Sequence, residues 1–194
     1  MGKLSVWLLL ITALILCGCD FVKEQSIKSN YRKHQVHSAN NLKQIGQAIW
    51  LFAEENDGAL PQSFSQLSTV EPELFVAPYD TQSTPAAATA VIFPDNSSYA
   101  YLVPPLSSYP DSDSGGNFII SYETPVAMEK PWLLPEYADS VNILFADGHV
   151  ETIPMKNVSK MNCEEIIVQI LKTRDVDPLT QTAIIEKART EDGK

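Results

Sequence analysis

The spacing of apolar side chains predicts a long helix near the start of the chain. From about Phe21 to Asn56 apolar residues recur with a helical period. The apolar face of this segment contains Leu42, Ile45, Ile49 and Phe52. Up to about residue 37 the segment is too polar to be buried throughout, which predicts a solvated spacer. Asn56, Asp57 and Gly58, with Pro61 beyond them, predict where the helix ends.

Beyond the helix the pattern changes to short extended runs. Prolines and small polar residues dominate between Pro61 and Gly116, where only residues 99–103 form a convincing strand. Further strands are expected at 118–122, 141–145 and 150–153. Asp147 and Gly148 lie between the last two of these strands and predict a hairpin with a type I′ turn, in which Phe145 faces Val150.

The end of the chain is again helical in its pattern. Asn162 with Glu165 is compatible with a capping box, and an apolar stripe follows. Asp177 and Pro178 predict the start of a second short helix that ends near Ala188. Residues 189–194 are expected to be a frayed polar tail.

These elements predict an α+β fold, with a long N-terminal helix packed on a small antiparallel sheet and two short C-terminal helices. We divide the chain into an α+β domain at residues 38–155 and a C-terminal helical extension at 156–194. The chain is long enough to bury the core of one domain.

The extreme N-terminus has a different composition. Lys3 precedes an apolar run from Leu4 to Leu16, whose ~13 residues fall short of the ~20 that a spanning helix needs, so the run predicts an export signal. The sequence Leu16-Cys17-Gly18-Cys19 resembles the lipobox of bacterial lipoproteins. The resemblance implies cleavage between Gly18 and Cys19 and a diacylglyceryl group on the Cys19 thiol. Residues 1–18 are then a signal peptide and residues 19–37 a polar spacer.

The lipobox resemblance places the protein in the cell envelope, attached to a membrane through lipidated Cys19. Asp20 resembles the signal that retains lipoproteins in the inner membrane of some bacteria. The periplasmic face of the inner membrane is therefore favoured, and the outer membrane stays open.

Charge and cysteine content narrow the function further. After cleavage the chain carries 13 Lys and Arg against 24 Asp and Glu, a formal net charge of −11. This charge disfavours nucleic acid and anionic lipid as partners, so membrane contact is expected through the lipid group. Cys163 is left as the one unmodified thiol, so no intrachain disulfide is expected.

Three segments resemble the large pseudopilin-like group of envelope proteins: residues 40–61 (NNLKQIGQAIWLFAEENDGALP), 120–125 (ISYETP) and 141–151 (VNILFADGHVE). The resemblance implies a pseudopilin-like head that takes part in a secretion or pilus-like assembly. Two features depart from the group. Gly2 is followed by Lys3 instead of a prepilin leader, and Tyr137 stands where many relatives carry a histidine.

Residues that could hold a metal ion are few. Asp147 and His149 form a short D-x-H, and His34 and His37 share a helix face, but two imidazoles without a third ligand rarely hold zinc. We interpret Asp147 and His149 as turn residues. Asp111 and Asp113 are calcium candidates, but the twelfth position of that loop is Tyr122, so the bidentate acid is missing. We therefore expect no cofactor.

Catalytic motifs are also scarce. There is no Gly-x-Ser-x-Gly and no phosphate-binding glycine loop, and Cys163 lies on an apolar stripe where a buried, inert thiol is expected. Trp50 and Trp132 are expected to be core or hairpin cover.

The sequence thus predicts a non-enzymatic, lipid-anchored envelope protein that binds another envelope protein, with no small-molecule substrate. Two alternatives remain open. One is a metal-dependent binding protein or enzyme that uses Asp147 and His149 or the Asp111–Asp113 loop. The other is a scaffold whose acidic head binds basic partners.

Overall fold

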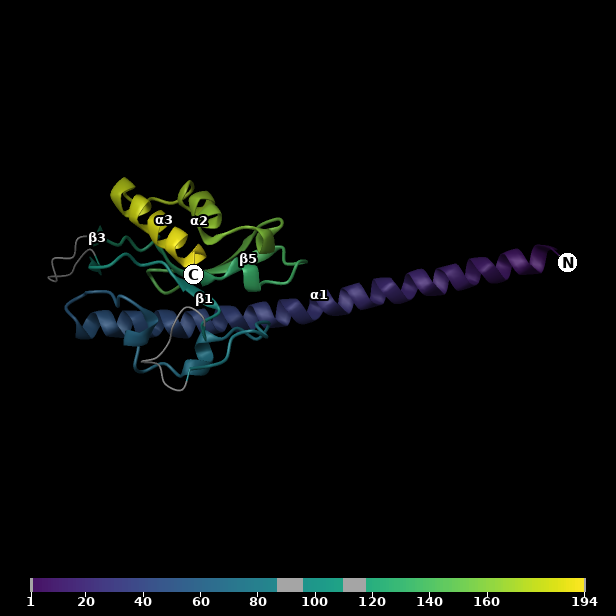
Figure 1. The fold of residues 1–194 in the computed structure, drawn as a ribbon, viewed down its shortest axis with the longest axis horizontal. Coiled ribbons are helices and arrows are strands. Elements are labelled where there is room, and N and C mark those ends of the chain that lie inside the picture. The colour runs from purple at the N-terminus through teal and green to yellow at the C-terminus, as the bar shows by residue number, and fades with distance from the viewer. Residues whose placement is uncertain (1, 87–95, 110–117, 194) are drawn as a thin grey trace.

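The computed structural model describes residues 2–86, 96–109 and 118–193, with the backbone alone for residues 2–24 and Ile119. Helix α1 (Gly2–Glu55) is continuous, and its N-terminal part projects from the rest of the molecule (Figure 1). The helix ends where expected. Asp57 and Gly58 both have left-handed φ angles, 53° and 83°, and the Gly58 N–H donates to the Ala53 carbonyl at 2.8 Å.

The described residues form a four-stranded antiparallel sheet in the order β1-β4-β5-β6. Its strands are β1 (Tyr99–Tyr101), β4 (Pro125–Glu129), β5 (Ser140–Phe145) and β6 (Val150–Pro154). A short parallel pair joins β2 (Ser107–Ser108) to β3 (Phe118–Ile119). The strands expected at 99–103, 141–145 and 150–153 are confirmed within two residues.

Short 3₁₀ turns connect these elements. Those lying wholly within the described residues are η1 (Phe64–Gln66), η2 (Pro72–Phe75), η5 (Pro131–Leu133) and η6 (Val158–Lys160). Proline opens η2 and η5 at the first helical position, where its missing N–H costs nothing. The short turns bring the loop-rich middle back against α1.

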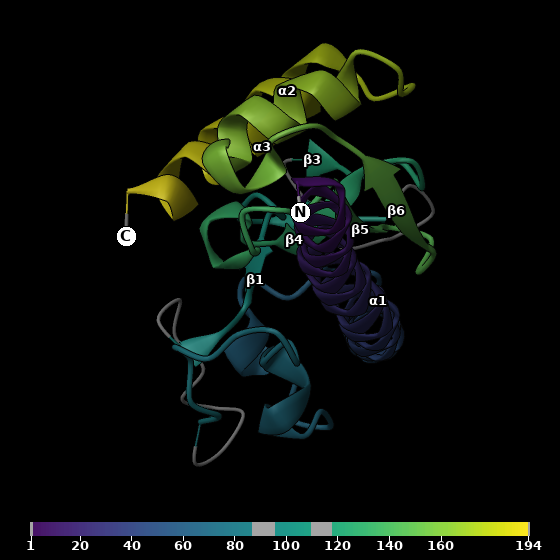
Figure 2. The same ribbon diagram turned by 90° about the vertical axis from the view of Figure 1, so that its right-hand side faces the viewer.

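The sheet lies between two helical layers, which confirms the α+β prediction (Figure 2). Helix α1 covers one face, and α2 (Cys163–Leu171) and α3 (Pro178–Asp192) cover the other. Alternation along β5 serves both layers, because Val141, Ile143 and Phe145 pack toward α2 and α3 while Leu144 packs toward α1. We use "head" for the sheet, α2, α3 and the loops packed on α1.

The apolar face of α1 packs as its pattern predicted. Leu42, Ile45 and Ile49 are fully buried against the sheet, and Phe52 is partly buried. Gly46 permits the close approach, because a Cβ there would lie 2.7 Å from Cδ1 of Leu144. A larger residue would push the helix away from β5.

The C-terminal helices begin where expected. The Asn162 and Glu165 capping box is present, and the Asp177 side chain accepts from the N–H groups of Leu179 and Thr180. The expected frayed tail at 189–194 is wrong. Helix α3 continues to Asp192, whose carboxylate accepts from the Cys163 and Glu164 N–H groups at 2.7 and 3.0 Å and so caps α2.

Strand β4 is the element that the sequence pattern missed. Strand β3 covers only the first two residues of the segment predicted at 118–122, and a turn at Ser121–Thr124 leads into β4. Pro125 and Glu129 are poor strand residues, yet every residue of β4 is buried between two paired neighbours. Tertiary packing, and not local propensity, makes this segment a central strand.

Among the described side chains of α1, Tyr31 is the first that is buried against the head, and it lies inside the segment whose polarity predicted a spacer to residue 37. The Tyr31 hydroxyl donates to the Ser140 carbonyl at 3.4 Å, and Nε2 of Gln35 donates to Oγ of Ser140 at 2.7 Å. Arg32 and Lys33 between them are exposed. At this end of the helix some polar side chains face solvent and others belong to a buried hydrogen-bond network.

Candidate functional site: a groove at the helix–head junction

The hairpin that carries Asp147 and Gly148 is present, but its turn differs from the prediction. Gly148 has a φ of 85°, whereas Asp147 is not among the described residues with positive φ, so the turn is not type I′. The Gly148 N–H donates to the Phe145 carbonyl, and the Phe145 N–H to that of His149, both at 2.9 Å. This is a three-residue loop with glycine in the bulge position. Val150 therefore pairs with Leu144 and not with Phe145.

His149 is explained by its contacts within the hairpin. Its Nδ1 lies 2.5 Å from Oδ1 of Asp147, and its ring stacks on Phe145 with centroids 4.6 Å apart. Arg174 lies over the same Phe145 ring and pairs with Glu151. Asp147 and His149 thus brace the turn, in agreement with their interpretation as turn residues.

The other sequence candidates are not brought together. His34 and His37 are exposed on α1. Asp111 and Asp113 lie outside the described residues, as do the side chains of Gly18 and Cys19. Over the part of the chain that the structure describes, no three His, Cys, Asp or Glu side chains lie close enough together to hold a metal ion.

Cys163 occupies the position expected from its apolar stripe. Its side chain is completely buried, and burial together with the neighbouring Asp192 raises the pKa of the thiol. A thiol that stays protonated and inaccessible is a poor nucleophile.

The two tryptophans contradict the sequence interpretation. Trp50 on α1 is 54% exposed and Trp132 in η5 is 43% exposed, so neither is core or hairpin cover. The Trp132 ring instead lies beside Nζ of Lys130, 6.0 Å from the ring centroid. The helical spacing of Leu42, Ile45 and Ile49 already places Trp50 outside the apolar face of α1. This spacing, and not the residue type, indicates that Trp50 is exposed.

A groove of about 340 Å³ lies where α1 enters the head. One wall is α1, and the other walls are the loops that follow η2 and η5. Its lining residues are Ile27, Asn30, Tyr31, His34, Pro78, Tyr79, Thr81, Pro135 and Tyr137. We call this the junction groove. Among the described residues, its lining contains no Asp, Glu, Lys or Arg and consists mainly of aromatic and proline side chains.

Three tyrosines hold the junction groove together. Tyr31 packs edge-on against Tyr137, with centroids 5.7 Å apart and planes at 89°, and tilts against Tyr79 at 6.3 Å. Burial raises the pKa of both the Tyr31 and the Tyr79 hydroxyl. The rings therefore present neutral aromatic surface.

Beneath the junction groove lies a buried polar network centred on Glu129. Oε1 of Glu129 accepts from Oγ of Ser38 at 2.5 Å and from Nδ2 of Asn142 at 3.0 Å, and Oε2 accepts from the Asn142 backbone N–H at 2.7 Å. Nδ2 of Asn142 also donates to the Gln35 carbonyl at 2.9 Å. Burial raises the pKa of the Glu129 carboxyl, and these hydrogen bonds oppose part of that rise.

No protein-family model, curated protein or solved structure matches the chain. The helices, taken over the described residues, include none with the length and apolarity needed to cross a bilayer.

The chemistry of the junction groove suits binding more than bond cleavage. Glu129 is enclosed and its carboxylate oxygens accept hydrogen bonds from Ser38 and Asn142, so it is not presented to a ligand. Aromatic faces and proline rings instead suit an extended segment with proline or aliphatic side chains. The sequence signal for this groove was weak, because its residues come from segments 27–34, 78–81 and 135–137.

Proposed function

We propose that the protein is a membrane-tethered bacterial lipoprotein, anchored through Cys19, whose pseudopilin-like head binds another envelope protein and catalyses no reaction. The binding site is the junction groove. The observation that carries the proposal is the position of this largely aromatic groove where α1 enters the head. Figure 1 shows that α1 projects from the head at this end.

The length of α1 supports a tether of defined reach. At 1.5 Å per residue, the helix between Cys19 and Tyr31 spans about 18 Å. Lipidation at Cys19 would then hold the junction groove a short distance above the bilayer. At that height it could bind a partner that is itself part of a membrane-bound assembly, such as a secretion or pilus-like complex.

The exposure of Tyr137 supports the same proposal. Its side chain is 45% exposed although its ring contacts the buried Tyr31, so it offers a rigid aromatic surface to a partner. Exposed aromatic side chains held in place by packing lose little entropy on binding.

The test combines site-specific crosslinking with analysis of the mature N-terminus. A photo-crosslinking residue replaces Tyr137, or in the control replaces Tyr122, which is 52% exposed and lies outside the junction groove. In the native host, position 137 should give a discrete crosslink to an envelope protein and position 122 should not. Mass spectrometry of the same sample should show an N-terminal, acylated Cys19.

The two parts of the proposal fail separately. A chain that starts at Met1 or carries an unmodified Cys19 would overturn the anchor. Identical crosslinks from positions 137 and 122 would overturn the junction groove as the binding site.

A further inference from the structure

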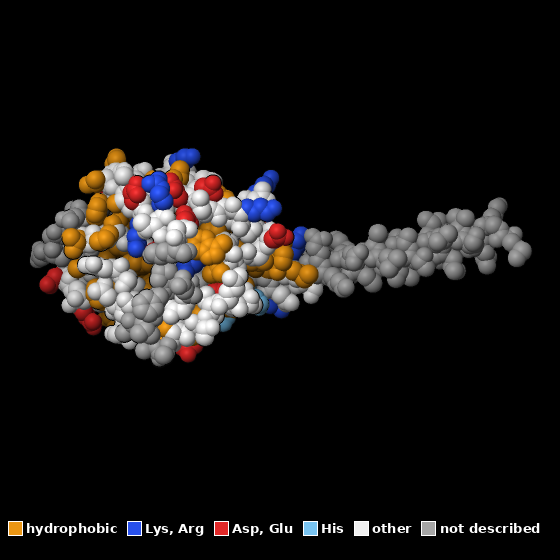
Figure 3. All heavy atoms as spheres, viewed as in Figure 1, with side chains coloured by type: hydrophobic (Ala, Val, Ile, Leu, Met, Phe, Trp, Pro, Cys, Tyr) orange, Lys and Arg blue, Asp and Glu red, His pale blue; other side chains and the backbone are white. Residues whose placement is uncertain are grey.

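Positive charge is concentrated on one part of α1. Between Gln25 and Ala53 there are four Lys and Arg residues and no Asp or Glu. Residues 54–194 carry 8 Lys and Arg against 22 Asp and Glu, a formal charge of −14. Acidic side chains spread over the head in Figure 3. Glu54 and Glu55 end α1 directly after this stretch, so the net charge of the chain conceals a basic segment of α1, residues 25–53, beside an acidic head.

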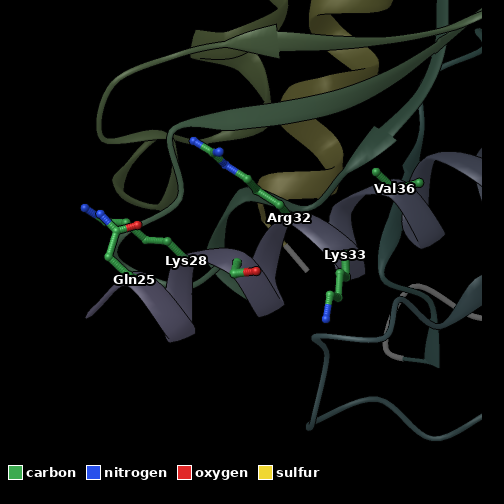
Figure 4. Close-up of a pocket in the computed structure, with 6 residues that line it drawn as sticks. Gln25, Lys28, Arg32, Lys33 and Val36 are labelled. Carbon is green, nitrogen blue, oxygen red and sulfur yellow. The ribbon is translucent and has the colours of Figure 1, made fainter. Parts of the chain in front are cut away.

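The basic residues share the solvent side of the helix. At 100° per residue, Lys28, Arg32, Lys33 and Lys43 all fall within about 80° of Val36, on the side opposite the residues buried against the sheet. All five side chains are exposed. Figure 4 shows four of them on successive turns of α1, around a shallow hollow of about 840 Å³. We call this surface the cationic face of α1.

The cationic face also contains exposed apolar side chains. Val36 is 64% exposed, Trp50 is 54% exposed and Leu51 is 40% exposed. Tryptophan prefers the boundary between headgroups and acyl chains, and Lys and Arg pair with lipid phosphates. Cationic and interfacial side chains on one exposed helix face are typical of a surface that lies on a membrane.

We propose that the cationic face of α1 lies on the anionic headgroups of the bilayer to which the protein is attached. The proposal rests on the proposed anchor, which holds one end of the same helix at the membrane. Within a Debye length of the surface, anionic lipid attracts Lys28, Arg32, Lys33 and Lys43. The same field repels the acidic head, which selects the orientation with α1 down and the head away.

Position along the chain favours lipid over an acidic protein as the occupant. Lys28 is nine residues from Cys19, about 14 Å along the helix, and Trp50 is about 46 Å from Cys19, so the whole cationic face reaches the headgroups when α1 lies nearly parallel to the bilayer. The apolar side chains on the same face would gain from contact with acyl chains but not from contact with a charged protein surface.

The test uses the full-length protein purified in detergent from its host and reconstituted into vesicles. In a Trp7→Phe/Trp132→Phe background, Trp50 is the sole tryptophan and reports on the face. Vesicles contain brominated phosphatidylcholine alone or with phosphatidylglycerol. Trp50 emission should be quenched and shifted to the blue in the anionic vesicles, and both effects should fade in 0.5 M salt.

Charge reversal supplies the matched variants. Arg32→Glu/Lys43→Glu should weaken binding to the anionic surface about twentyfold or more, since each cation contributes about fivefold. Lys156→Glu/Lys160→Glu makes the same change of net charge at exposed head positions and should leave quenching unchanged. Circular dichroism melts check that both variants stay folded.

Three outcomes would overturn the proposal. The first is equal quenching of Trp50 in neutral and anionic vesicles, and the second is equal quenching in the two double variants. The third is salt-sensitive self-association without quenching, which would show that the cationic face binds the acidic head of a second copy. None of these readouts depends on acylation. An unmodified Cys19 with intact quenching would overturn the anchor alone.

Discussion

The two faces of the sheet are covered by helices in different ways. On the α2 and α3 side the buried contacts are almost entirely apolar, with Ile166, Ile167 and Ile184 at zero exposure. On the α1 side an apolar half around Ile45 is joined to a polar half around Glu129. Residues at zero exposure occur on both faces, so the difference described here is one of chemistry.

The comparison teaches how a long helix can be fixed in register on a short sheet. Apolar contacts are less directional than hydrogen bonds, whereas Ser38, Gln35 and Asn142 meet their hydrogen-bond partners in one register only. A misaligned helix would leave Glu129 buried without donors, which is costly. We infer that the α1 side determines alignment and that the α2 and α3 side contributes most of the apolar stability.

The largest effect is expected from breaking the polar side. Asn142→Ala removes the amide donor to Glu129 and to the Gln35 carbonyl, so both acceptors lose a buried partner. The free energy of unfolding should fall by about 4 kcal/mol. Urea denaturation with an unchanged m-value is the measurement. A loss below 1 kcal/mol would show that the network does not hold the helix.

Breaking the apolar side should cost somewhat less. Ile167→Ala leaves a cavity under α2, at a residue with zero exposure. The expected loss is about 3 kcal/mol in the same urea experiment. Leu179→Ala, at 65% exposure on α3, is the control and should change stability by less than about 0.5 kcal/mol. Equal losses for the two variants would contradict the assignment of stability to this side.

The contact between α1 and β5 offers a sharper probe of alignment. In Gly46→Ala the new methyl group contacts Leu144, which lowers the free energy of unfolding by about 2 kcal/mol. The higher helix propensity of alanine raises it by about 1 kcal/mol. The net loss should be about 1 kcal/mol. In the Leu144→Ala background the same substitution should become neutral or stabilising, and a double-mutant cycle measures that coupling. If the effects of the two substitutions simply add, Gly46 and Leu144 are not in contact as described.

The pH dependence of stability tests the environment of Glu129. Because burial raises the pKa of this carboxyl, the native state keeps its proton at pH values where the unfolded chain has lost it. The free energy of unfolding should therefore fall as pH rises from the ordinary glutamate value through the native pKa. Glu129→Gln removes that dependence. The difference in free energy of unfolding between the wild type and this variant, measured between pH 4 and 8, isolates the contribution of Glu129. A difference that rises with pH would contradict the raised pKa.

The sequence predicted the elements whose signals are local. The helix end at Asp57 and Gly58, the capping box at Asn162 and the burial of Cys163 each depend on a few adjacent residues, and all are confirmed. Strand β4 could not be predicted this way, because its residues become a strand only between β1 and β5. The turn at Gly148 was predicted in place but not in type.

The candidate site was less predictable than the fold. The junction groove joins three segments that are far apart in the sequence, and its tyrosines have no spacing in common. The exposure of single residues was also hard to predict from residue type. Trp50 and Trp132 have the composition of core residues, but their exposure is decided by which side of an element faces the sheet. The capping role of Asp192 has no local sequence signal, because the N–H group of Cys163 that it accepts from lies 29 residues away.

One helix serves both as the projecting arm and as a layer of the core. Gln35 hydrogen-bonds to β5, and Gly46 lies against Leu144, so the arm has no joint where it enters the head. These contacts tie the orientation of α1 directly to that of the sheet. If the anchor and the partner are as proposed, a change in the inclination of α1 would turn the junction groove toward or away from that partner without any rearrangement inside the head.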